Sequence, residues 1–112
     1  MAERRGANLL ASAAAGDEVA FQHIIDTHHE DLRRVCQAIS GDHAIADDAT
    51  QAAWLVAWKK LHKVRGPEQL RPWLMSVAVN EAKKLMSKRK RRAQIESDAD
   101  ASAEPGGTDP AT

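Results

Sequence analysis

The sequence predicts a small all-α protein, a bundle of three to four helices. Hydrophobic residues make up 43% of its 112 residues, which is enough for a core, whereas Gly and Pro number only 6 and 4. Apolar residues recur at three- and four-residue spacing over long stretches, which is the period of an amphipathic helix. Residues that cap helices stand before these stretches. A chain of this length has room for one small domain.

The first helix is expected to be short. Asn8 can act as its N-cap and Gly16 can stop it, so the predicted span is residues 8–15. A helix of this length is not stable alone in water. Residues 1–7 are expected to form a flexible N-terminus.

The second and third helices each begin at an aspartate. Asp17 can cap a helix that runs to about Ser40 and ends at Gly41. Asp42 can cap the next helix, which is predicted to reach about Lys63. The apolar residues of this third helix cover more than one face, so one face is expected to remain for a partner.

A fourth helix is predicted over residues 71–92. The Gly66–Pro67 step indicates a loop before it, and Pro72 suits its first turn, where the missing N–H would be unpaired anyway. Its inward-facing stripe consists of Leu74, Val77, Ala78 and Leu85. The opposite stripe is polar and increasingly basic, and consists of Ser76, Asn80, Lys83 or Lys84, Ser87 and Arg91.

Charge is segregated along the chain, although 16 basic and 16 acidic residues give a formal net charge of zero. Residues 83–92 are rich in Lys and Arg and contain no acid, whereas the charged residues after Arg92 are all acidic. Residues 93–112 also contain almost no apolar anchor, so they are expected to form a disordered acidic tail that follows residues 8–92.

The single cysteine, Cys36, indicates a reducing compartment, because it cannot form an internal disulfide. The apolar run near the N-terminus, residues 9–15, is too short and too weakly hydrophobic for a signal peptide or a membrane span. We therefore expect a cytoplasmic protein with no membrane partner.

Catalytic and metal-binding motifs are not found. His28 and His29 point about 100° apart on a helix, and no HExxH or paired CxxC accompanies them, which favours a solvated face over a metal site. Asp47 and Asp48 also diverge on a helix, and acids in a first turn commonly meet the helix dipole. We expect no enzymatic activity, no catalytic residue, no metal, no cofactor and no small-molecule substrate.

The basic run over residues 83–92 has the residue types that contact phosphates. Alone it is equally well explained as a solvated helix end that complements the helix dipole. Trp73 adds a stacking surface, Asn80 an amide that can read a base edge, and the loop at Arg65 a flexible lip. This combination suits single-stranded or opened DNA, although a lone Trp is more often a core residue.

Three motifs occur in the order and spacing of a known family. They are Leu9-Leu10 through Gly16-Asp17-Glu18 with Phe21, then residues 47–58 (DDATQAAWLVAW), then residues 71–82 (RPWLMSVAVNEA). Over about residues 8–92 the chain resembles region 2 of extracytoplasmic-function (ECF) sigma factors. The resemblance implies a helical transcription-initiation domain that binds the β′ clamp helices of bacterial RNA polymerase core and recognises and melts the minus-ten promoter element on its non-template strand.

The resemblance also implies where these partners bind. The polymerase-binding surface is expected at Asp48, Gln51, Ala52 and Leu55 of the third helix. The loop over residues 63–70 resembles the specificity loop that captures a flipped base. With the residues already singled out, the DNA-binding set is Arg65, Trp73, Ser76, Asn80, Lys83, Lys84, Ser87, Lys88 and Arg91.

The chain departs from the family pattern in two ways. Ala52 stands where the family usually has an acidic residue after the glutamine, and an acidic tail stands where a second, minus-thirty-five-reading domain normally follows. These departures motivate an alternative, a single-domain sigma-like module that binds polymerase or an anti-sigma factor without initiating transcription. A fragment of a two-domain sigma factor and a natural single-domain protein both remain open at this stage, as does an incidental helical bundle with a basic end.

Overall fold

Helices follow one another through residues 2–100, the part of the chain that the computed structural model describes, with side chains described over residues 8–98. In chain order they are α1 (Ala2–Ala14), α2 (Glu18–Ser40), α3 (His43–Lys60), the 3-10 helix η1 (Leu61–Lys63) and α4 (Pro67–Asp100). No β-strand occurs over this range, so the all-α prediction is confirmed.

The predicted caps of α2 and α3 are confirmed. The Asp17 carboxylate accepts hydrogen bonds from the N–H groups of Val19 and Ala20, at 2.9 and 3.2 Å. The Asp42 carboxylate accepts two equivalent bonds at the start of α3, at 2.8 and 3.1 Å. Gly41 ends α2 with a positive φ of 66°, which glycine adopts at no steric cost. These local signals set both ends of the turn between α2 and α3.

The first helix is longer than predicted. It begins at Ala2, so Asn8 lies inside it and is not its N-cap. The sequence of residues 2–5, Ala-Glu-Arg-Arg, consists of good helix formers. The expected stop at Gly16 is confirmed by its φ of 103° just beyond the helix.

The fourth helix is also longer than predicted at both ends. Pro67 occupies its first turn, and Pro72 lies inside it at an exposed position, where it has no N–H to donate to the carbonyl of Glu68 one turn earlier. At the other end α4 continues through Asp100, so residues 93–100 are helical and not a disordered tail. These eight residues include no Gly or Pro to stop the helix. The rest of the expected tail, residues 101–112, lies outside the described residues.

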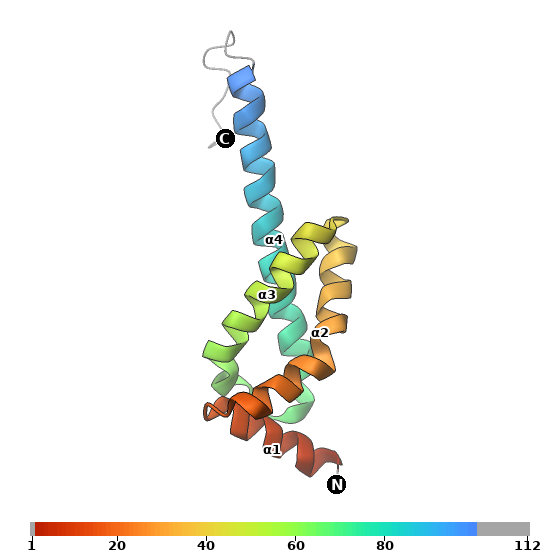
Figure 1. Ribbon diagram of the computed structural model, residues 1–112, viewed down its shortest axis with the longest axis vertical. Helices are drawn as coiled ribbons and strands as arrows, with labels where there is room; N and C mark the ends of the chain where they lie inside the picture. The colour runs from red at the N-terminus through yellow and green to blue at the C-terminus, as the bar shows by residue number, and fades with distance from the viewer. Residues whose placement is uncertain (1, 101–112) are drawn as a thin grey trace.

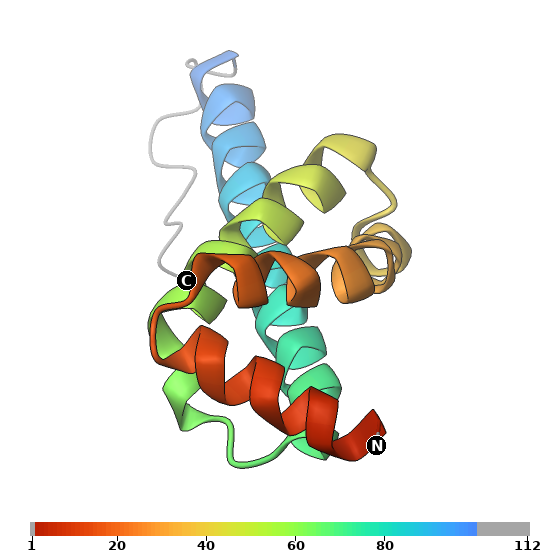
Figure 2. The same ribbon diagram turned by 60° about the horizontal axis from the view of Figure 1, so that its bottom comes forward.

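The core lies where α2, α3 and α4 pack on one another, with α1 across one end (Figures 1 and 2). Leu32, Leu61 and Leu74 are fully buried at its centre. The buried stripe of α3 consists mainly of alanines, and Ala78 and Ala82 of α4 are fully buried as well. Small side chains let helix axes approach closely, so α4 lies directly against α3. The stripe comprises Ala46, Ala49, Ala53 and Ala57.

The distal part of α4 projects beyond the other helices, which gives the molecule extents of 66 × 22 × 20 Å (Figure 1). Residues 87–98 of this part are all exposed. The predicted inward stripe of α4 is confirmed nearer its start, since Leu74, Val77 and Ala78 are buried and Leu85 is half-buried. The basic run therefore leaves the bundle on a single exposed helix.

Candidate functional site

One face of α3 remains uncovered, as predicted. Asp48, Gln51 and Leu55 are exposed and Ala52 is half-buried, and these four residues follow the three- and four-residue spacing of a single stripe. Trp58 continues the stripe one turn further. Leu55 and Trp58 are 68% and 39% exposed, so an apolar patch lies at the end of the stripe. We call these five residues the α3 face.

Aromatic packing fixes the orientation of this face. The ring of Phe21, on α2, lies edge-on to Trp54 at 5.9 Å between centroids and contacts Trp58 at 4.9 Å. The indole N–H of Trp54 donates a 3.1 Å hydrogen bond to Nδ1 of His29. These contacts hold α3 against α2 and turn Leu55 outward.

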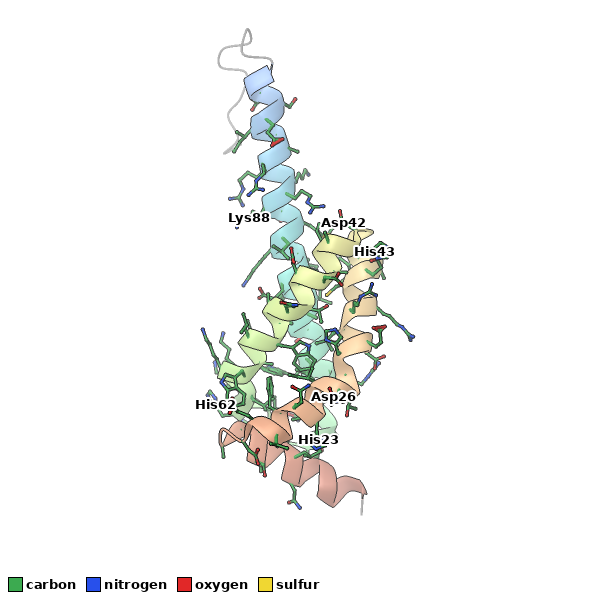
Figure 3. All side chains as sticks on the ribbon, in the orientation of Figure 1. His23, Asp26, Asp42, His43, His62 and Lys88 are labelled. Carbon is green, nitrogen blue, oxygen red and sulfur yellow. The ribbon has the colours of Figure 1, made fainter. Side chains whose placement is uncertain are left out.

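The histidines do not gather into a metal site. His29 accepts the Trp54 hydrogen bond, and burial lowers the pKa of the half-buried His28, with Asp31 acting in the opposite direction. Figure 3 labels three other histidines, and they lie in different parts of the molecule. Over the part of the chain with described side chains, no three His, Cys, Asp or Glu residues form a group that could hold a metal ion.

The predicted DNA-binding stripe of α4 lies on one exposed face. We call it the α4 face; its members are Ser76, Asn80, Lys83, Lys84, Ser87, Lys88 and Arg91, all exposed. Five of these side chains, from Lys83 to Arg91, line a shallow groove of about 460 Å³. The hydroxyl of Ser76 donates to the Trp73 carbonyl at 2.7 Å, so its proton is already used within the helix.

A second groove joins this face to α3. The α3–α4 groove has a volume of about 530 Å³ and includes four of the predicted DNA-binding residues: Trp73, Ser76, Asn80 and Lys84. Trp73 is half-buried and packs against the core with one side. The opposite wall comes from the end of α3 and from η1. The remaining lining residues are Val56, Lys60, Lys63, Val77 and Glu81.

Three lysines and one acid give the α3–α4 groove its charge. Lys60 and Lys63 are exposed on one wall and Lys84 on the other. Glu81 is the acid, and its side chain is only 15% exposed. The Lys84 ammonium lies 3.2 Å from a Glu81 carboxylate oxygen. The groove is therefore positive at its rim, with a fixed carboxylate inside.

The predicted specificity loop is shorter than expected. Only residues 64–66 are irregular, because η1 ends at Lys63 and α4 begins at Pro67. Lys63 lines the α3–α4 groove, whereas Arg65 is exposed beside it and is not among the lining residues. The segment over residues 67–70, expected as loop, is the first turn of α4.

The start of α3 lies against the basic part of α4. Asp48 of the α3 face shares a hollow of about 230 Å³ with Lys88, Arg89 and Arg92. Arg89 forms an ion pair with Asp42, the N-cap of α3. Figure 3 shows Asp42 at the turn before α3, at about the same height as Lys88, where the basic part of α4 leaves the bundle. Arg89 of the basic run thus links α4 to the N-terminus of α3.

The pKa of Asp42 is held below its ordinary range by the contacts of this turn. The hydrogen bond from the Ile45 N–H is the main cause, and the Arg89 pair and the Ala44 N–H act in the same direction. The Asp42 carboxylate is thereby stabilised in its charged form, which caps α3 and binds Arg89.

Sequence reasoning missed three residues of these surfaces. Lys60 and Glu81 line the α3–α4 groove, and Trp58 extends the α3 face. Lys63, which also lines the groove, was predicted only as the first residue of the specificity loop. The basic pair Lys59-Lys60 at the end of α3 could have indicated that this end of the helix contributes cations to a binding surface. The local sequence of residues 76–84 does not distinguish Glu81 from a solvent-exposed acid, because the burial of the Glu81 side chain depends on the packing of α3.

Comparison with known proteins identifies a matching family model. Residues 24–92 match the model described as Sigma-70 region 2, which covers more than half of the chain. Over the described residues, no helix combines the length and the apolar character needed to cross a bilayer. No solved structure matches the chain significantly.

Two curated relatives are similar to the chain over most of its length. The ECF RNA polymerase sigma factor SigM of Mycobacterium tuberculosis is 37% identical over 78 residues, which are 70% of this chain and 40% of SigM. The RNA polymerase sigma factor NccH of Alcaligenes xylosoxydans xylosoxydans is 27% identical over 77 residues, which are 69% of this chain and 41% of NccH. The matched part of the chain thus spans about two fifths of each of these relatives. By its family match and these relatives, the chain belongs to the sigma-70 region 2 family, as a region 2 domain of the ECF sigma factor type.

Proposed function

We propose that this domain docks on RNA polymerase core through the α3 face and recognises the non-template strand of the minus-ten promoter element through the α4 face. The observation that supports this most is the α3–α4 groove, in which the end of α3 and the polar stripe of α4 form two walls of one positively rimmed surface. A strand in this groove would contact the helix that binds polymerase and the helix that carries the basic run.

The chemistry of the α3 face suits a protein partner. Leu55 and Trp58 supply exposed apolar area at one end of it, and Asp48 and Gln51 supply polar groups toward the other end. Protein interfaces commonly combine an apolar, aromatic centre with a polar rim. The proposed partner is the β′ clamp helices of bacterial RNA polymerase core.

The chemistry of the α4 face suits an opened DNA strand. Lysines along it neutralise phosphates and release counterions, while Asn80 offers a donor and an acceptor to a base edge. Unstacking a base costs a few kcal/mol, and stacking on an aromatic ring recovers about 1–3 kcal/mol per base. The half-buried Trp73 supplies such a ring at the groove.

Substitution of Leu55 tests the docking half of this proposal. Leu55→Glu places a charge in the apolar patch of the α3 face, so it should weaken core binding at least about tenfold without unfolding the domain. Val19→Glu is the matched control, because Val19 is equally exposed at 69% but lies on α2. Fluorescence titration of the labelled chain with core polymerase provides the measurement. Equal affinity of the two variants would contradict docking through the α3 face.

Ala52 favours a second candidate function, the sigma-like interaction module that binds polymerase or an anti-sigma factor without starting transcription. A half-buried methyl group stands at this point of the α3 face, where the family usually supplies a carboxylate. Reconstituted transcription with core separates the two functions, since the module should bind a protein partner and yield no promoter-specific transcript. Under the main proposal, Ala52→Glu should increase core affinity several-fold by restoring a polar contact.

A further inference from the structure

We propose that Glu81 is a base-reading residue, whose carboxylate accepts a hydrogen bond from the exocyclic amino group of one unpaired adenine or cytosine in the α3–α4 groove. This inference rests on the proposed function and adds a specificity determinant to it. It also assigns Lys60 and Lys63 to the phosphates of the same strand.

The position of Glu81 separates it from an ordinary surface acid. Its side chain is 15% exposed, whereas its ion-pair partner Lys84 is 73% exposed. The carboxylate therefore faces the inside of the α3–α4 groove, while the ammonium lies toward the rim. Val56 and Val77 provide apolar lining around it, and Trp73 provides an aromatic ring. A volume of about 530 Å³ lies within the usual range of small-ligand sites, roughly 300–1,000 Å³.

A carboxylate in this place discriminates because it is only an acceptor. It repels phosphates, so it contributes nothing to general affinity for DNA. At the major-groove edge of a base it accepts from the amino groups of adenine (N6) and cytosine (N4), whereas guanine and thymine present the carbonyl oxygens O6 and O4 there. A keto base in this orientation would leave two acceptors facing each other without a proton between them, which is costly in a partly buried site. Glu81 therefore contacts the base at its major-groove edge; at the Watson–Crick edge guanine would donate from N1 and N2, so a preference for guanine would overturn the inference.

The neighbouring lysines make such an acid compatible with a polyanion. Lys84 holds the carboxylate at 3.2 Å and partly neutralises it. Lys60 and Lys63 lie on the facing wall, where they can meet the phosphates on either side of an inserted base. Among the residues with described side chains, the Asn80 amide has no hydrogen-bond partner, so it is available to the same base. The groove thus provides one acceptor inside and cations outside, an arrangement suited to a nucleotide in an opened strand.

The test uses the full chain bound to bacterial RNA polymerase core and labelled non-template strands. A randomised pool first selects the preferred minus-ten strand, and each of its positions is then replaced by all four bases. Wild type should favour adenine or cytosine over guanine and thymine by about tenfold at one position. Glu81→Gln should reduce that preference to about twofold or less, because an amide both donates and accepts.

Two variants control for charge and for folding. Glu96→Gln removes the same charge from an exposed site of the same helix, so it should change affinity for all strands equally and leave the base preference intact. Glu81→Asp keeps the carboxylate and should keep the direction of the preference, weakened by the shorter side chain. Thermal unfolding followed by circular dichroism shows whether each variant is folded.

The outcomes separate this inference from the function on which it rests. If wild type binds core and selects strands while folded Glu81→Gln keeps the full preference, Glu81 is not a base reader and the proposed function stands. An equal loss of preference in Glu96→Gln would also overturn the inference, since charge alone would then explain the effect. If wild type with core selects no strand, the proposed DNA recognition fails, and the role of Glu81 fails with it.

Discussion

Asn80 and Lys88 lie about two turns apart on the α4 face and are expected to contribute differently to DNA binding. Asn80→Ala should reduce discrimination between cognate and scrambled strands, because it removes a base-edge donor and acceptor. Lys88→Ala should weaken binding to all strands alike and make the salt dependence shallower by about 0.7 in log–log slope, the value for one phosphate contact to a single strand. Affinities of both variants for both strands, measured over a salt series, check this. Identical losses on the two strands for both variants would refute the division of roles.

Asp42 is expected to make the stability of the domain pH-dependent. Because the folded protein holds its pKa below the ordinary value of 3.8, the carboxylate contributes stability above that value, and this is lost as pH falls through the lowered pKa. Asp42→Asn keeps a good capping residue but removes the titrating group. Between about pH 6 and about pH 3, wild type should lose more unfolding free energy in urea than this variant. A loss of the same size in both proteins would show that the Asp42 contacts do not depend on its charge.

At the scale of elements, the buried alanine stripe of α3 sets how closely the neighbouring helices can pack on it. Ala57 is fully buried, so Ala57→Leu forces extra volume between packed helices and should cost about 1–3 kcal/mol of unfolding free energy. Ala38→Leu makes the same change at an exposed position of α2 and should be nearly neutral. Urea unfolding of the two variants gives the comparison. Equal stability would mean that Ala57 is not closely packed in the core.

The elements that could be predicted from sequence are those with local signals. Asp17 and Asp42 were identified as caps because a cap depends only on its own side chain and the next few N–H groups. The end of α4 was predicted too early because the change of charge and composition after Arg92 is typical of a disordered segment. Residues 93–100, however, contain no helix breaker, and the helix continues through them. Two prolines stand near the start of α4, and the first of them, Pro67, begins the helix.

At the scale of the whole molecule, the residues of the α3 face and the α4 face could be predicted from the sequence, but the α3–α4 groove could not. The residues of the α3 face and the α4 face follow from helical periodicity and from the family resemblance. The meeting of Lys60 and Lys63 with Asn80 and Glu81 depends on how α3 crosses α4, which alanine packing determines and no short pattern encodes. The same packing places Asp48 beside Lys88, so the two proposed surfaces adjoin each other at the start of α3.

Selection of strands by the polymerase-bound domain tests the central claim most directly. The labelled chain is titrated with bacterial RNA polymerase core, with and without a pool of non-template strands randomised over the minus-ten element. The proposed function predicts that the chain binds core through the α3 face and that the complex then enriches particular strands, with enrichment lost in Leu55→Glu and retained in Val19→Glu. Binding to core without enrichment of any strand would contradict minus-ten recognition, and a folded chain that ignores core would contradict the docking role as well.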